Sequence, residues 1–490
     1  MIKKYLVYIL MLMLLSSTTS QAQYDRYWLM GYDCCAPEFG GVNFDFQGGG
    51  SPVISYVQRY MNLNCTNGVI SDQSGNLLFY SNGIYVANAL DDTMQNGSGL
   101  NPGYWANQRI DVGLSTPQAN LVIPIPGDSM RYYLFHETVD DVGVTWSSYY
   151  LFYSIIDMNL DGGLGAVVQK NTVLFQDTLI EGRLTAVKHA NGRDWWLFSH
   201  KWNSGKIFKF LITPYGIQGP FVQNIFTVRV NYFGQMLFSP QGDKFAYYDP
   251  EGDLDVWDFD RCSGNFSNRE FVTIIDSAAG GGAAFSASGR YLYVSSHRYV
   301  YQFDVNDVSN SQTTIAVYDG FQSGGLSCNF YLSALAPDGK IYINSGNSSI
   351  DLHVINNPDS AGSASDFCQH CLHLPATNAF TMPNYPNYYL GPQTGTACDS
   401  LSTAIFPVKV PVNAFNVFPN PASEIFYLTL VGEKVSDVLV YNSMGQLQSV
   451  EIDVVNENYL SFNTISLVSG VYFISFRNAN GRMVRRVVVK

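Results

Sequence analysis

A turn followed by a short aromatic strand recurs along the chain and constrains its fold more than any other feature. The strands after these turns begin at residues 77, 132, 195, 245, 291 and 341, so successive spacings are 55, 63, 50, 46 and 50 residues. A period of about 40–50 residues with several short strands is typical of a β-propeller, because one blade cannot bury both of its faces alone. We predict an all-β propeller over residues 23–398.

The number of blades depends on how the two ends of this region are assigned. Six units are visible in the repeat, and a seventh can be assembled from Tyr27–Met30, Val42–Phe46 and Asn387–Leu390. Residues 23–398 number 376, which gives about 54 residues per blade for seven blades and about 63 for six. We favour seven blades and keep six as the alternative.

One blade resembles the tryptophan–aspartate (WD40-like) repeat in detail. Phe238–Gly242 is close to the F-S-P-D-G turn of that repeat, and Val256–Asp258 contains the dipeptide that names it. The other units match only in outline. The resemblance implies the propeller fold and says nothing about activity.

The composition favours strands and tight turns over helices. Charged residues are 14% of the chain, against roughly 25% in an ordinary soluble domain. The 33 Tyr, 31 Phe and 43 Gly suit sheets and turns. With 27 basic and 40 acidic residues the net charge is −13. Nucleic acid is therefore excluded as a main partner, since binding phosphates needs a basic face.

The first 22 residues have the pattern of a secretory signal peptide. Lys3 and Lys4 precede an apolar run of eleven residues, Tyr5–Leu15, and small residues follow as far as Ala22. A run of about 7–15 apolar residues suits a signal peptide, whereas a membrane span needs about 20. We expect cleavage after Ala22 and no transmembrane segment in the mature protein.

The end of the chain changes character after a predicted linker at residues 399–414. Short alternating strands over residues 415–490 suit a small Ig-like β-sandwich. Four stretches resemble the C-terminal (Por-type) sorting domain of the type IX secretion system of Bacteroidota: Val417–Ala422, Val440–Gln446, Gly470–Ile474 and Arg485–Lys490. The sorting-motif residues are Pro419, Asn420, Pro421, Gly445, Gly470, Arg485 and Lys490.

This resemblance implies how the protein is handled in the cell. The type IX machinery would carry it across the outer membrane, and a sortase-like peptidase would remove the domain, leaving the protein extracellular or attached to the cell surface. Gly75–Gly83, Leu184–Trp196 and Met382–Tyr388 look similar to segments of secreted Bacteroidota propellers with the same tail. That family supplies no biochemical activity to carry over to residues of this chain.

Polar residues follow the second strand of the repeats, at turns that open on the same propeller face as the loops between blades. We expect a shared ligand-binding face formed by His136, Glu137, His200, Lys201, Asp249, Glu251, His297 and Arg298. Mixed donors and acceptors around a central mouth suit a polar ligand such as a glycan or a peptide. The alternative is that these turns are polar because water reaches them.

Eight cysteines in an exported chain indicate disulfide bonds. Cys368 and Cys371 are a candidate pair. Together with His373 they also resemble half of a zinc site, since thiolates and imidazoles both ligate zinc, but no second half follows at matching spacing. We favour a structural disulfide or free thiols.

Calcium is the second ion that the sequence suggests, and no cofactor is expected. Asp157, Asn159 and Asp161 match the first half of a calcium loop, in which alternate side chains converge on one cation. Val168 stands where an EF-hand would have Glu. A polar hairpin is therefore the preferred interpretation of this segment.

The function predicted from these features is binding. G-x-S-x-G, H-E-x-x-H and G-x-x-x-x-G-K-[ST] do not occur in the sequence, so the usual signals of serine hydrolases, zincins and P-loop enzymes are missing. We favour a non-catalytic exported propeller that binds a polysaccharide or a protein. The alternatives are a propeller glycoside hydrolase or lyase acting on extracellular polysaccharide, which needs carboxylates about 5–10 Å apart in a central pocket, and a structural role in a surface layer.

Overall fold

The structure is a computed structural model of the chain and describes residues 23–32, 39–141, 143, 146–229, 234–251, 253–276, 280–399, 415, 417–430, 435–456, 459–478 and 481–490. The predicted signal peptide lies outside the described residues, as does the predicted linker except for residue 399. The chain divides into two compact units, Met1–Leu401 and Ser402–Lys490. Among the described residues, no helix is long and apolar enough to cross a membrane.

The N-terminal unit consists of antiparallel sheets that follow one another along the chain. Its strands are β1 (Tyr27–Tyr32), β2 (Gly40–Asp45) and β3 (Val53–Val57); β4 (Gly68–Ser71), β5 (Leu77–Ser81), β6 (Tyr85–Asn88) and β7 (Thr93–Ser98); β8 (Asn120–Pro124), β9 (Arg131–Glu137), β10 (Asp140–Asp141), β11 (Trp146–Asp157) and β12 (Ala166–Leu179); β13 (Thr185–Lys188), β14 (Trp195–His200), β15 (Ser204–Thr213) and β16 (Gly216–Arg229); β17 (Gln235–Phe238), β18 (Lys244–Asp249), β19 (Asp253–Asp260) and β20 (Asn265–Val272); β21 (Gly282–Phe285), β22 (Tyr291–Ser296), β23 (Tyr299–Asp304) and β24 (Thr313–Val317); the short hairpin β25 (Gln322–Ser323) and β26 (Leu326–Ser327); and β27 (Ser333–Leu335), β28 (Ile341–Ile343), β29 (Ser349–Ile355) and β30 (Phe367–Asn378). The helical elements among these residues are short, as in α2 (Tyr104–Gln108).

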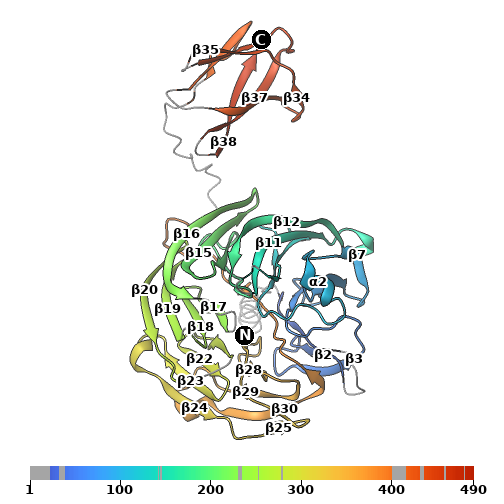
Figure 1. Ribbon diagram of the computed structural model, residues 1–490, viewed down its shortest axis with the longest axis vertical. Coiled ribbons are helices and arrows are strands. Elements are labelled where there is room, and N and C mark those ends of the chain that lie inside the picture. Colours follow the sequence, from blue (N-terminus) through green and yellow to red (C-terminus); the bar gives the residue numbers. More distant parts are fainter. Residues whose placement is uncertain are drawn as a thin grey trace, which may run out of the picture. The chain divides into compact units, whose positions relative to one another are not determined.

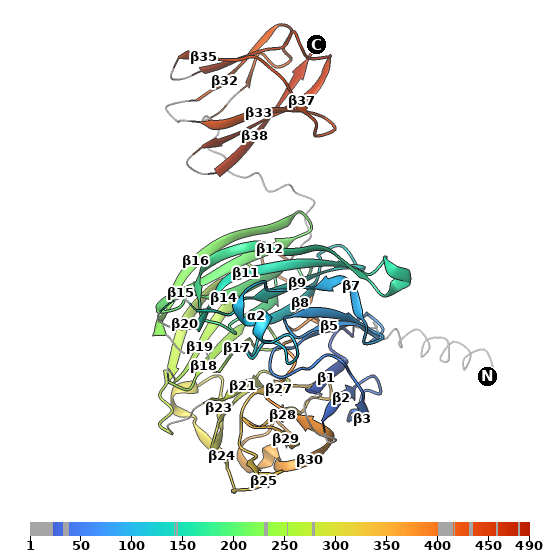
Figure 2. The same cartoon turned by 45° about the vertical axis from the view of Figure 1, so that its right-hand side comes forward.

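These sheets form a closed ring around a common centre. Figure 1 shows β17 toward the centre and β20 and β24 at the rim, and Figure 2 places β21 and β27 toward the centre as well. Each sheet shares a cluster of buried apolar side chains with the next sheet, and the last sheet shares one with the first. Radial stacking of this kind buries both faces of every sheet. The all-β propeller predicted from the repeat is confirmed.

The six aromatic strands of the repeat are present as the second strands of their sheets, β5, β9, β14, β18, β22 and β28. A single parallel residue pair between β7 and β12 joins two neighbouring sheets into one of nine strands. Within the described residues this sheet can be counted as one unit or two, which gives six or seven units in the ring. The preference for seven blades therefore stays a prediction.

The predicted seventh unit was right in part. Tyr27–Met30 and most of Val42–Phe46 lie in the paired strands β1 and β2, but residues Asn387–Leu390, which the structure describes, form no strand. The third strand of this sheet is β3. The sheet closes the ring because Trp28 packs against Tyr342 of the last sheet, with ring centroids 5.8 Å apart.

The C-terminal unit is a sandwich of two four-stranded antiparallel sheets. One contains β31 (Val417–Phe418), β32 (Ile425–Thr429), β36 (Tyr459–Asn463) and β35 (Ile452–Asn456), and the other β34 (Leu447–Gln448), β33 (Ser436–Asn442), β37 (Gly470–Asn478) and β38 (Gly481–Val489). Phe426 and Phe462 of the first sheet share one core with Ile474 and Val487 of the second. The predicted β-sandwich is confirmed.

Candidate functional site

The chain segment after β30 runs across the inner ends of the sheets. We call residues 379–392 the closing segment. Tyr385 donates its hydroxyl to the carbonyl oxygen of Tyr27 at 2.6 Å, and Tyr388 donates to that of Val122, also at 2.6 Å. The closing segment thus binds strands that lie more than 250 residues earlier in the chain.

Side-chain amides cap the main-chain groups that the innermost strands leave unpaired. Gln118 donates to the carbonyl oxygen of Met236 and accepts its N–H, both at 2.9 Å. Gln235 accepts the main-chain N–H groups of Ala283 and Ser333, both at 3.0 Å. Because a buried main-chain group without a partner is costly, these amides hold the inner strands of different sheets together at the centre of the ring.

Asn384 of the closing segment completes this set of amides. Its Nδ2 donates to the carbonyl oxygens of Asn120 and Leu184, both at 3.0 Å, and its Oδ1 accepts from Gln118 at 3.3 Å. Gln118, Gln235 and Asn384 all line one cavity at the centre of the ring. Since each amide is engaged with other parts of the protein, together they form a rigid end to that cavity.

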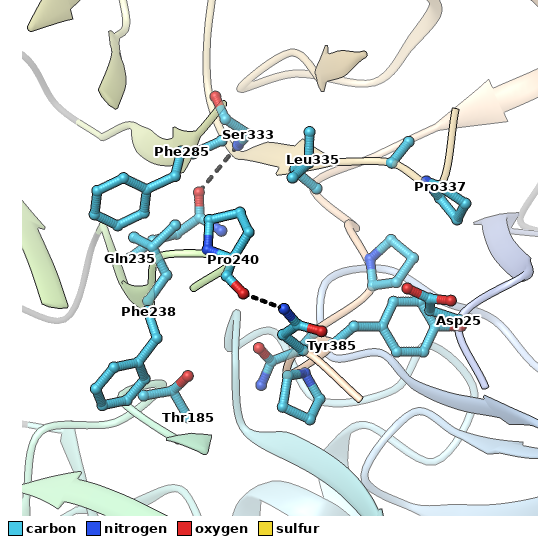
Figure 3. Close-up of a pocket in the computed structure, with 18 of the residues that line it drawn as sticks. Asp25, Thr185, Gln235, Phe238, Pro240, Phe285, Ser333, Leu335, Pro337 and Tyr385 are labelled. Carbon is cyan, nitrogen blue, oxygen red and sulfur yellow. Dashed lines mark hydrogen bonds between the residues drawn. The ribbon is translucent and has the colours of Figure 1, made fainter. Parts of the chain in front are cut away.

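The central cavity has a volume of about 320 Å³. The turn residues Pro240, Ala287 and Pro337, each between the first and second strand of a sheet, line it, so the cavity extends toward that side of the propeller. Residues labelled in Figure 3 are Asp25, Thr185, Gln235, Phe238, Pro240, Phe285, Ser333, Leu335, Pro337 and Tyr385. Aromatic residues, alanines and prolines make up much of the lining, together with residues that carry hydroxyl or amide groups.

Main-chain groups of the innermost strands also face the cavity. The N–H groups of Ala283 and Ser333 point inward, because they bond to Gln235. Main-chain groups two residues further along a strand point to the same edge. Phe285 and Leu335 therefore direct their N–H and C=O groups toward the cavity, which both residues line.

Asp25 is the one carboxylate among the described residues that line the cavity. Burial raises the pKa of this carboxyl group, and a hydrogen bond from the Tyr389 hydroxyl partly offsets the effect. The cavity therefore combines the main-chain groups of Phe285 and Leu335 with a single acid.

The residues predicted to form a binding face lie at the other ends of the second strands. Among the described residues, none of the eight lines the central cavity. Glu137, His200 and Asp249 end β9, β14 and β18 and are buried, and His136 beside Glu137 is buried as well. Glu251 and Arg298 are exposed. Most of this predicted set is thus bonded within the protein.

Each histidine of the set has partners in the fold. His136 bonds to Asn101 at 2.7 Å and to Ser154 at 2.9 Å, and burial lowers its pKa to about 3. His297 lies against the amide of Asn329, and burial lowers its pKa too. Lys201 forms an ion pair with Asp177. His136, with both ring nitrogens bonded and a lowered pKa, is thus held within the fold.

His200 belongs to a hydrogen-bonded chain between two sheets. Its Nδ1 lies 3.0 Å from the hydroxyl of Tyr247, and its Nε2 lies 2.9 Å from the carbonyl oxygen of Ser204. Arg183 donates its Nε–H to the same tyrosine hydroxyl at 3.0 Å. Arg183 is fully buried.

Two glutamates with raised pKa values lie near this chain. Glu137 accepts the N–H of Gly182 at 3.0 Å and the hydroxyl of Ser199 at 3.1 Å, yet burial raises its pKa to about 8. Burial also raises the pKa of Glu181 to about 7, against the opposing effect of Arg183. Glu181 and Arg183 were not predicted as site residues, although two charged residues between the apolar Ile180 and Leu184 were a usable signal.

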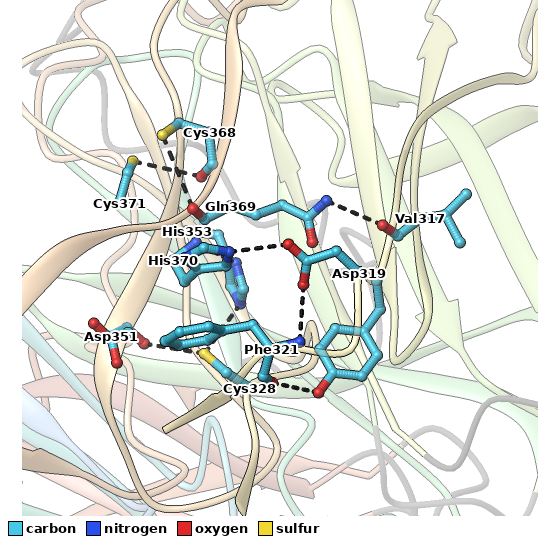
Figure 4. Close-up of polar contacts among 11 residues, drawn as sticks. Val317, Asp319, Phe321, Cys328, Asp351, His353, Cys368, Gln369, His370 and Cys371 are labelled. Atoms are coloured by element: carbon cyan, nitrogen blue, oxygen red, sulfur yellow. Dashed lines mark hydrogen bonds and ion pairs between the residues drawn. The ribbon is translucent and has the colours of Figure 1, made fainter. Parts of the chain in front are cut away.

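The candidate pair Cys368 and Cys371, predicted to form a disulfide or to be free thiols, is not joined in the structure. Cys368 and Cys371 are both free thiols on β30, and each donates toward a main-chain carbonyl oxygen, Cys371 toward that of Cys368 at 3.5 Å (Figure 4). The structure instead joins Cys262 to Cys398, which are 136 residues apart in sequence. That bond links the turn after β19 to the chain beyond the closing segment.

Cys328 and His353 do not form a nucleophile–base pair. Nδ1 of His353 accepts the main-chain N–H of His370 at 3.0 Å. The ring proton of His353 is therefore on Nε2, which faces Cys328 Sγ at 3.7 Å (Figure 4). A ring nitrogen that already carries a proton cannot take one from the thiol. Burial also raises the pKa of Cys328 to about 11 and lowers that of His353 to about 4.

The candidate calcium loop is a polar hairpin between β11 and β12. Asp157 accepts both the main-chain N–H and the side-chain amide of Asn159 at 2.9 Å, and Asp161 is exposed in a short 3-10 turn. Among the residues that the structure describes, no group of three or more His, Cys, Asp or Glu side chains is placed to hold a metal ion.

Several sorting-motif residues hold the last strand in place. Asn420, between Pro419 and Pro421, donates to the carbonyl oxygen of Arg486 at 3.0 Å and accepts the N–H of Val488 at 2.9 Å. Among the other motif residues, Gly445 lies in the β33–β34 turn at φ +77° and Gly470 begins β37. Arg485, in the middle of β38, donates to the carbonyl oxygen of Phe415 at 2.8 Å, and the main-chain N–H of Lys490 donates to the carbonyl oxygen of Ala422 at 2.8 Å.

Comparison with solved structures returns other proteins of low sequence identity. A candidate 6-phosphogluconolactonase from Bacteroides fragilis is 12% identical, with 75% of this chain and 98% of that chain covered and a TM-score of 0.41. A second one, from Bacteroides uniformis, is 14% identical (68% and 92% covered, TM-score 0.40). PorZ, a surface component of the type IX secretion system of Porphyromonas gingivalis, is 12% identical (92% and 68% covered, TM-score 0.30).

None of the curated proteins compared with the chain matches it. Residues 416–490 do match a family, described as the secretion system C-terminal sorting domain. This range covers the sandwich of β31–β38 and all seven motif residues. The C-terminal unit therefore belongs to the sorting domains of type IX secretion, and the chain joins such a domain to an all-β propeller.

Proposed function

We propose that this protein is a type IX-exported binding propeller that holds part of a glycan in its central cavity. The observation that carries the proposal is the cavity itself, whose lining combines aromatic residues with main-chain edges of the innermost strands. Sugar units carry hydroxyl groups that both donate and accept, next to apolar C–H faces. Neutral donors and acceptors set among aromatic side chains match that chemistry.

The size and chemistry of the cavity support binding more than hydrolysis. Its volume of about 320 Å³ falls within the range of small-molecule sites, which is about 300–1,000 Å³. Glycoside hydrolysis generally uses two carboxyl groups on either side of the bond that is cleaved. Asp25 is the only acid that the described residues bring to the cavity.

The sorting domain supports export across the outer membrane. We propose that a sortase-like peptidase removes it and leaves the propeller released or attached to the cell surface, in an organism of the Bacteroidota. The signal peptide at residues 1–22 is part of the same proposal. Mass spectrometry of the protein from culture medium and from the outer membrane would give both mature ends; a chain that retains residues 415–490 outside the cell would contradict removal.

Binding can be tested by narrowing the cavity. Ala287 is exposed and lines the cavity at a turn, so Ala287→Trp adds a large side chain there without burying it in the fold. Ala361 is exposed before a short 3-10 turn and lies outside the cavity lining. Ala361→Trp is therefore the matched control.

The measurement is binding of the full chain and both variants to a glycan array, followed by calorimetry on the strongest ligand. We expect Ala287→Trp to weaken binding at least about tenfold and Ala361→Trp to leave it unchanged. Equal binding by both variants would remove the cavity as the site. Retention of no glycan by the unaltered chain would contradict the proposed ligand class.

A further inference from the structure

A second pocket, a groove of about 370 Å³, is lined by residues that are close in sequence to some of those lining the central cavity. The two share structural elements, since Thr185 of β13 lines the cavity and Lys188 at the end of the same strand lines the groove. Asp25 and Tyr24, which are adjacent in sequence, likewise line the cavity and the groove. One ligand could therefore contact both.

Lys188 carries the charge that distinguishes this groove. Its ammonium group lies over the ring of Trp195, 5.4 Å from the centroid. Among the described residues, no carboxylate lies within ion-pair distance of its Nζ atom. Burial, and next the positive charge of Arg261, lowers its pKa to about 8. The ammonium group of Lys188 is thus partly buried, and it forms no ion pair with a carboxylate of the described residues.

The other charged side chains that line the groove are neutralised. Asp128 is paired with Arg131 at 2.7 Å, and Arg193 is paired with Asp194 at 2.7 Å. Lys188 therefore supplies the uncompensated charge among the described residues of the lining.

The neighbouring Arg261 adds to the positive charge. Its guanidinium donates to the main-chain carbonyl oxygens of Lys188, His189 and Gly391, at 2.8, 3.1 and 2.7 Å. A carbonyl oxygen accepts a hydrogen bond without cancelling the charge of the donor. Two cations thus lie close together, although the carboxylate of Asp243 offsets part of the charge of Arg261.

We propose that this groove binds an anionic group on the glycan whose neutral part occupies the central cavity, so that the ligand is an acidic glycan. This inference rests on the proposed function. A carboxylate or a sulfate ester would complete the pairing that Lys188 lacks, because a charged hydrogen bond in a partly dry site is stronger than one in water.

The test compares three oligosaccharides of similar length on the full chain: a neutral galacto-oligosaccharide, an oligogalacturonide and a sulfated galacto-oligosaccharide. Lys188→Gln removes the charge, and Lys206→Gln removes an exposed charge on β15 as the control. We expect Lys188→Gln to weaken binding of at least one acidic ligand about tenfold or more. Binding of the neutral ligand should change less than about twofold. The two acidic ligands distinguish a carboxylate from a sulfate.

The outcomes separate this inference from the proposed function. If Ala287→Trp abolishes binding of all three ligands while Lys188→Gln has no selective effect on the acidic ones, the groove is not an anion site and the cavity still is the glycan site. If no oligosaccharide binds, the proposed function fails. The groove is then tested by acetylation of the unaltered chain with and without galacturonate or sulfate. Protection of Lys188, and not of Lys206, supports an anion site; equal acetylation under all conditions overturns it.

Discussion

The carboxylate of Glu137 accepts the main-chain N–H of Gly182 at 3.0 Å, and so links the end of β9 to the loop that leads into the next sheet. Gly182 adopts φ +70°, and a Cβ atom on this residue would lie 2.2 Å from the carbonyl oxygen of Pro117. The contact therefore needs glycine on one side and a buried acid on the other.

Replacing this acid should change how stability depends on pH. The pKa of Glu137 is about 8 in the folded protein and about 4.3 in an unfolded chain. The stability contributed by the protonated group is fully present below the lower value and is lost as pH rises through the upper one. Glu137→Gln carries no titrating proton at this position. Between pH 5 and 9 we therefore expect the unfolding free energy of this variant to fall less than that of the unaltered protein, by on the order of 2–4 kcal/mol.

Urea denaturation across this pH range measures the effect. Glu251→Gln is the control, because Glu251 is exposed. Glu181, with a pKa of about 7, should leave part of the slope in the Glu137→Gln variant. An unchanged slope in that variant would show that Glu137 ionises normally in the folded protein.

Gln235 should contribute strongly to the stability of the ring. Gln235→Leu leaves the buried N–H groups of Ala283 and Ser333 without their acceptor, at a cost of about 1–3 kcal/mol for each. Gln235→Glu keeps an oxygen acceptor at this position and should cost less. Thermal and chemical denaturation of the two variants measure the difference; equal losses would mean that side-chain shape, and not the acceptor, is what matters.

The Cys262–Cys398 disulfide should stabilise the propeller by limiting the unfolded chain. The bond closes a loop of 136 residues in sequence, and for a loop of this size we expect about 4–5 kcal/mol. Cys262→Ser with Cys398→Ser should lower the melting temperature as much as reduction does. The matched pair Cys368→Ser and Cys371→Ser should change it little, and a large drop there would indicate that those thiols are joined in the secreted protein.

The sorting domain offers a test on one side chain. Asn420→Ala removes the hydrogen bonds to Arg486 and Val488, and should destabilise the sandwich by about 1–3 kcal/mol. Less protein should then reach the culture medium, which quantitative immunoblotting of medium and cells measures. Met444→Ala, at an exposed turn position, is the control. Normal secretion of the Asn420→Ala variant would show that export does not depend on these hydrogen bonds.

The strands of both units could be predicted from sequence because their signals are local. Each aromatic strand of the repeat directly follows a turn, and strand β14, for example, begins at Trp195 as predicted. The closing segment could not be predicted in this way, since Asn387–Leu390 has strand-like residues but pairs with no strand. Its conformation depends on partners such as Val122, far away in the chain.

The candidate site was harder to predict than the fold for a physical reason. The cavity is lined by Ala, Phe and Pro side chains and by main-chain groups, and none of these has a chemical signature in a sequence. Polar residues such as His136 have such a signature, but burial makes them structural. Whether Lys188 has an acidic partner depends on contacts between sheets, which sequence spacing does not encode.

The closing segment also sets the order in which the ring can be completed. Side chains between residues 384 and 388 donate hydrogen bonds to four main-chain carbonyl oxygens, those of Tyr27, Asn120, Val122 and Leu184. A chain emerging from the ribosome makes its N-terminal sheets first, so these early sheets keep unsatisfied inner edges until almost the whole propeller has been synthesised. The hydrogen bonds at the inner edges of the first sheets therefore form only when the closing segment is present, and the propeller is complete only then.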